Sequence, residues 1–73
     1  MSERDDPVVG KLGRVSHPIA PGTTGEVVLH IRGGTETYMA VADDDLARDT
    51  EVLVVAHLSA RTVRVTPFAG ALS

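Results

Sequence analysis

Five short runs rich in β-branched and other apolar residues, each bounded by glycine, proline or polar residues, limit the possible folds of this chain more than any other feature. They occupy residues 8–16, 23–32, 35–42, 50–58 and 61–66. The second run alternates most clearly, because Val27, Leu29 and Ile31 share one face and the residues between them are mostly polar. The pattern predicts an all-β domain of short strands joined by turns.

Closure of the sheet is the second expectation. A chain of 73 residues forms one small domain, and an open sheet of five short strands would leave two edges and one face bare. The break at 43–49 contains three consecutive aspartates and predicts a short turn rather than a full helix between strands three and four. This arrangement favours a small five-stranded closed barrel of the OB type, and an SH3-like barrel is the alternative.

The alternation also predicts the domain limits and the core. Residues 1–7 are expected to form a disordered lead, residues 8–68 the barrel, and residues 69–73 a frayed tail. Gly33-Gly34 is expected to form the hairpin turn between strands two and three. The side chains predicted to fill the core are Leu12, Val15, Val27, Leu29, Ile31, Val52, Val54, Val63 and Val65.

Composition argues against several classes of function. The net charge is −3, and because residues 1–6 contribute −2, the rest of the chain is nearly neutral. Nucleic-acid binding is therefore not expected, since such proteins present a basic field and, for single strands, several aromatic rings; only Tyr38 and Phe68 are present here. The lack of cysteine favours a cytoplasmic location. The polar start is no signal peptide, and no apolar run is long enough for membrane insertion.

The residues that could take part in catalysis or bind a metal ion do not form a recognisable catalytic or metal-binding motif. His17, His30 and His57 are widely separated, whereas zinc needs three or four convergent ligands. Ser16 and His17 could be imagined with the aspartates at 43–45 as a hydrolytic triad, but adjacent residues of a strand point to opposite faces. We therefore expect no enzyme activity, no cofactor and no small-molecule substrate.

Exposed residues of strands two and three supply the candidate partner surface. If Val27 and Leu29 face the core, Val28 and His30 face outward, and Met39 stands beside Val28 on the next strand. An apolar strip of this kind is typical of protein contact. The candidate surface consists of Ile19, Val28, His30, Arg32, Met39, Val41 and Arg61. Its two arginines could contact the phosphates of a nucleic acid instead of a protein.

The order of small and apolar residues resembles the OB domain of NfeD-like proteins across about residues 9 to 66. The residues that carry the resemblance are Gly10, Gly13, Pro21, Gly22, Tyr38, Ala40, Leu46, Val52, Val54, Val63 and Val65. Asp49 stands where the family has a glycine, and residues 28–32 look like a lengthening of strand two. The resemblance implies that Tyr38 and Ala40 point inward and that the chain is a free-standing copy of a non-catalytic domain.

The leading hypothesis is a soluble, non-enzymatic OB-fold module that binds a protein partner or a second copy of itself. The family resemblance implies a membrane-associated, stomatin-like protein as one such partner. The alternative hypothesis is a weak single-stranded nucleic-acid binder that uses Arg32 and Arg61.

The predicted register of strand two can be tested by truncating one core side chain. Leu29→Ala should lower the free energy of unfolding by about 2–5 kcal/mol, a large share of the stability of so small a domain. Urea denaturation measures this loss. A loss below about 1 kcal/mol would mean that the facing of this strand is wrong.

Overall fold

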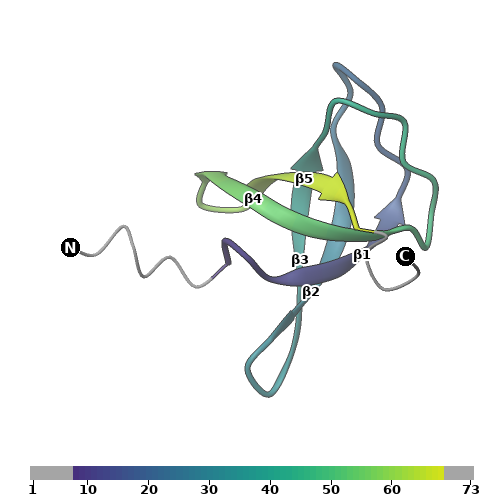
Figure 1. Cartoon of the computed structure of the whole chain (residues 1–73). Helices are drawn as coiled ribbons and strands as arrows, with labels where there is room; N and C mark the ends of the chain where they lie inside the picture. Colours follow the sequence, from purple (N-terminus) through teal and green to yellow (C-terminus); the bar gives the residue numbers. More distant parts are fainter. Residues whose placement is uncertain (1–7, 69–73) are drawn as a thin grey trace.

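The computed structural model describes residues 8–68 and contains five strands; the expected lead at 1–7 and tail at 69–73 lie outside these residues. The strands are β1 (Leu12–His17), β2 (Gly25–Ile31), β3 (Gly34–Val41), β4 (Glu51–Ser59) and β5 (Thr62–Pro67). Figure 1 shows them wrapped around a single interior, with the β2–β3 hairpin extending beyond the barrel.

The sheet closes in the order β1-β2-β3-β5-β4, and β4 returns to pair with β1. Every pairing is antiparallel except that of β3 with β5, which is parallel over Met39–Val41. This is the strand order of an OB barrel, so the predicted all-β closed barrel is confirmed. Residues 8–68 contain no helix, and the connection between β3 and β4 is a series of bends and turns.

The core is formed by inward-facing side chains, and it corrects part of the prediction. Seven of the nine predicted residues are buried, Ile31 packs partly against the core, and Leu12 is 44% exposed. The reason is the period of two along β1: Gly13 and Val15 share the inward face, so Leu12 must point outward. The buried residues that were not predicted as core are Val8, Ile19, Tyr38, Ala40, Ala42 and Leu46.

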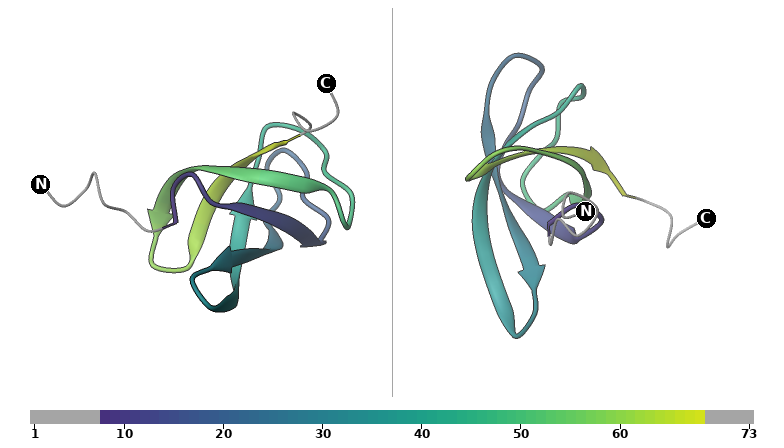
Figure 2. Two further views of the ribbon diagram at one scale, coloured as in Figure 1. Left: turned by 60° about the horizontal axis from the view of Figure 1, so that its bottom comes forward. Right: turned by 90° about the vertical axis from the view of Figure 1, so that its left-hand side faces the viewer.

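Two loops cover one end of the barrel and account for the burial of Ile19. The amide of Ile19 donates to the carbonyl of Leu46 at 3.0 Å, and the amide of Leu46 donates back at 2.8 Å. Figure 2 shows the β1–β2 loop and the β3–β4 connection on the same side of the barrel. Ile19, expected on the candidate surface, is instead 2% exposed, because its loop folds over the core with Leu46.

The β2–β3 turn lies one residue earlier than expected. Ile31 pairs with Gly34, so the β2–β3 turn consists of Arg32 and Gly33 rather than Gly33 and Gly34. Gly33 has φ 79°, which is the left-handed conformation that glycine adopts at low cost. The shift frees Gly34 to begin β3 and lengthens the hairpin.

Asp49 occupies the turn position at which the NfeD-like pattern has glycine. Its φ of 75° is left-handed, and its amide donates to the carbonyl of Val15 at 2.8 Å. The amide of Val15 in turn donates to the carbonyl of Thr50 at 2.9 Å. The turn is therefore held against β1 just before β4 begins, with Asp49 in the left-handed conformation.

Substitution at this turn should separate backbone strain from side-chain effects. Asp49→Val should destabilise the domain by about 1–2 kcal/mol relative to Asp49→Gly, because a β-branched side chain is strained at positive φ. Paired urea melts of the two variants and the native protein measure the difference. Equal stability of the valine and glycine variants would show that residue 49 is not held in the left-handed conformation.

Candidate functional site

The outer face of β2 and β3 presents the predicted apolar residues, but in a broken pattern. Tyr38 and Ala40 are buried and Met39 is 49% exposed, so the predicted facing of β3 is confirmed. Met39 lies directly opposite Glu26, whereas Val28 lies opposite Thr37. Val28 and Met39 are thus diagonal neighbours, separated by polar side chains rather than directly adjacent.

The other members of the candidate surface extend away from Met39 in two directions. Val41 is half-buried and lies beside Arg64 of β5. His30 is exposed opposite Thr35 near the end of the hairpin, and Arg32 is exposed in its turn. Met39 therefore lies between Val28, its diagonal neighbour, and Val41, which follows two positions later on β3, and His30 and Arg32 lie at the tip.

Arg61 makes three contacts with consecutive residues of β3. Its Nη1 lies 3.5 Å from Oε1 of Glu36, and its Nη2 donates to the carbonyl oxygen of Thr37 at 2.9 Å. Its guanidinium carbon lies 4.6 Å from the centroid of the Tyr38 ring, which is a cation–π distance. His57 packs edge-on against the same ring. No sequence pattern indicated this cluster, because it depends on the β3–β5 pairing.

The remaining arginines do not form a basic patch. Arg14 lies 3.6 Å from a carboxylate oxygen of Glu51, and Arg64 lies 3.2 Å from one of Asp43. With Arg61 beside Glu36, each of these three arginines has an acidic neighbour. Within residues 8–68, Arg32 makes no ion pair, but it stands alone at the hairpin tip. This charge distribution does not favour a nucleic-acid interface.

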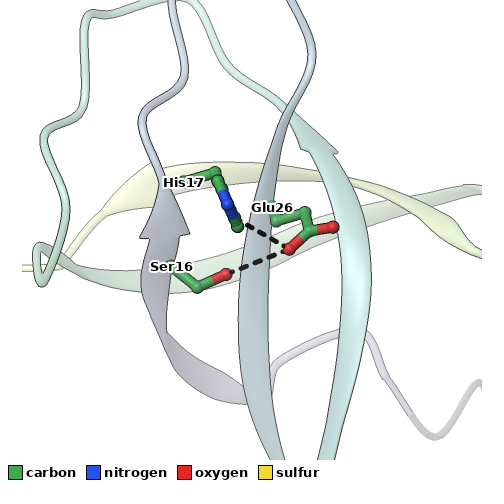
Figure 3. A network of polar contacts seen from close by, with 3 residues as sticks. All are labelled: Ser16, His17 and Glu26. Carbon is green, nitrogen blue, oxygen red and sulfur yellow. Dashed lines mark hydrogen bonds and ion pairs between the residues drawn. The ribbon is translucent and has the colours of Figure 1, made fainter.

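Ser16, His17 and Glu26 form a polar network that differs from the expected geometry. Nδ1 of His17 lies 2.9 Å from Oε1 of Glu26, and the hydroxyl of Ser16 donates to the same oxygen at 3.5 Å (Figure 3). The expectation that Ser16 and His17 point apart is wrong, because a β-bulge shifts the register between Val15 and His17. In a hydrolytic triad the serine bonds to the histidine; here both residues bond to the carboxylate.

A shallow groove of about 410 Å³ lies beside this network, on the outside of β1 and β2. Val15 and Val28 contribute apolar lining, and Arg48 and Asp49 come from the turn before β4. Within the part of the chain that the structure describes, no three His, Asp or Glu residues gather where they could hold a metal ion. The grouping of Arg48 with Val28 could not be predicted from spacing along the sequence.

A five-stranded barrel closed in this order, with only hydrophobic side chains buried among residues 8–68, defines a domain of the OB type. The NfeD C-terminal domain family matches residues 12–66, and the chain belongs to this family. The predicted resemblance is thereby confirmed, and the family is a non-enzymatic domain type.

A solved structure supports the same assignment. The chain is similar to the soluble domain of the NfeD protein YuaF from Bacillus subtilis, whose structure was determined in solution. The two are 34% identical with a TM-score of 0.75, and the match covers 90% of this chain and 80% of the other. Among curated proteins, no sequence matches the chain.

Among residues 8–68 there is no helix of the length and apolar character required to span a membrane.

The exposed pair of His17 and Glu26 should contribute little to stability. A double-mutant cycle with His17→Ala and Glu26→Ala should give a coupling energy of about 0.2–1 kcal/mol, because both side chains are largely exposed to solvent. A parallel cycle on Arg14 and Glu51 serves as the control and should fall in the same range. Coupling above about 2 kcal/mol at His17 would show that the network is a strongly organised site instead.

Proposed function

We propose that this chain is a non-catalytic interaction module that binds a protein partner through the outer face of β2 and β3. The observation that carries the proposal is Met39, a large apolar side chain that is 49% exposed at the centre of the face. Val28 and Val41 are its half-buried apolar neighbours on either side, and the polar side chains of Glu26 and Thr37 lie beside them.

Membership of the NfeD C-terminal domain family supports a non-enzymatic role. The partner to which the family resemblance points is a membrane-associated, stomatin-like protein, and self-association is the second possibility to be measured. The ion pairs of Arg14, Arg61 and Arg64 support a protein partner over a nucleic acid. A cytoplasmic location remains a prediction that rests on the lack of cysteine.

The proposal is tested by replacing Met39 with a charged residue. Met39→Glu should weaken binding to a purified stomatin-like protein by about tenfold or more, because it places a charge at the centre of an apolar contact. Calorimetric titration measures this binding, and sedimentation velocity measures self-association in the same samples. The thermal midpoint should stay within a few degrees of the native value, because the side chain is exposed.

Val55→Glu is the matched control. Val55 is 45% exposed and lies on β4, which pairs with β1 and β5 rather than with β2 or β3. If the Val55 variant loses binding and the Met39 variant keeps it, the proposed face is wrong. If neither variant changes partner binding or self-association, Met39 is ordinary surface and the proposal fails.

A further inference from the structure

β3 extends beyond the strand that pairs with it on its outer side. It pairs with β2 over Gly34–Ala40, but with β5 only over Met39–Val41. Within residues 8–68, no strand therefore pairs with Gly34–Thr37 on the side away from β2. Figure 1 shows this part of β3 running out from the barrel toward the hairpin turn.

Alternate residues of this edge direct their backbone N–H and C=O groups away from β2. The carbonyl of Thr37 accepts a bond from Arg61, and the amide of Met39 donates to the carbonyl of Arg61 at 2.8 Å. Because residues of a strand alternate in the direction of their N–H and C=O groups, Thr35 faces the same way as Thr37. The edge thus offers the amides of Thr35 and Thr37 and the carbonyl of Thr35 to an added strand.

The contacts of Arg61 show that a guanidinium group fits against this edge. Its guanidinium bonds to the Thr37 carbonyl at 2.9 Å, lies 3.5 Å from Glu36 and sits 4.6 Å over the Tyr38 ring. These are the three contacts that an arginine on an added strand would make at the same place. Arg61 therefore covers one end of the edge and must move aside when a strand is added.

The negative charge of Glu36 indicates which kind of strand would pair with this edge. In the two-fold pairing of β3 with a second copy that is centred on Glu36, Thr35 of each copy would lie opposite Thr37 of the other. Glu36 would then lie opposite itself, and like charges in directly opposed positions are destabilising. A basic side chain at this position would instead form an ion pair. The charge thus disfavours self-pairing centred on Glu36 and favours a basic strand.

We propose that the free edge of β3 over Gly34–Thr37 is a strand-addition site for an extended partner segment that carries arginine. This inference goes beyond the proposed face, because it names an adjoining site and the form and charge of the segment that would bind there. The added segment forms main-chain hydrogen bonds with Thr35 and Thr37, and its guanidinium replaces that of Arg61 on Glu36 and Tyr38.

The probe is a blocked peptide with the sequence Thr-Val-Arg-Val-Thr. This is the sequence of residues 62–66 in β5, the strand that pairs with the adjoining part of β3 over Met39–Val41. Titration into ¹⁵N-labelled protein should shift and protect the amides of Thr35 and Thr37. A peptide with glutamate in place of arginine should bind about fivefold or more weakly, because it meets Glu36 with a like charge. Arg61→Ala should bind the arginine peptide several-fold more tightly, because the edge is no longer covered.

Two variants separate the edge from the outer face. Thr35→Pro removes an amide that points away from β2, so the hairpin should persist while peptide binding is lost. Met39→Glu alters the face but leaves the edge, so the peptide should bind as it does to the native protein. If Thr35→Pro fails to fold, a peptide N-methylated at alternate residues removes the same hydrogen bonds from the other side.

Three outcomes would overturn the strand-addition site. They are equal binding of the arginine and glutamate peptides, shifts confined to the outer face that Met39→Glu abolishes, and no binding to either the native protein or Arg61→Ala at about 1 mM peptide. None of these decides the proposed function, because the effect of Met39→Glu on a stomatin-like protein is measured separately.

Discussion

The structure depends on β1 pairing with β2 on one side and with β4 on the other. This double pairing closes the sheet and removes the edges that five short strands would otherwise expose. Gly13 makes it possible, because a β-carbon there would lie 2.5 Å from the carbonyl oxygen of Val28. The close approach of β1 to β2 in turn allows a chain of 73 residues to enclose one core of small, mostly valine side chains.

Closure also explains why the interaction features lie where they do. The interior is filled, so the surfaces available for binding are the outside of the barrel and the hairpin that extends past it. β3 is longer than its overlap with β5, and this difference leaves Gly34–Thr37 paired on one side only. Met39 lies where the barrel and the hairpin meet, so the proposed face and the proposed strand-addition site adjoin each other.

Much of the fold could be predicted, because alternation along a strand is local. The parity of Val27 and Leu29 fixed the register of β2, and the turn chemistry at Asp49 matched the left-handed conformation found there. Leu12 was misplaced because two glycines obscure the alternation in its run. Ile19 was misplaced because only the contact with Leu46, 27 positions later in the chain, buries it. The bulge that turns Ser16 toward Glu26 and the cover of β3 by Arg61 likewise arise between distant segments.

Amide hydrogen exchange of the free protein tests the central claim, a closed barrel with an uncovered edge on β3, most directly. The amides of Val27 and Val54 should exchange only through global unfolding, because Val27 lies between two paired strands and the Val54 amide donates to the carbonyl of Lys11 at 3.0 Å. The amides of Thr35 and Thr37 should exchange near the rate of an unprotected amide. Fast exchange at Val54 would contradict closure of β4 onto β1, and slow exchange at Thr35 and Thr37 would contradict the free edge.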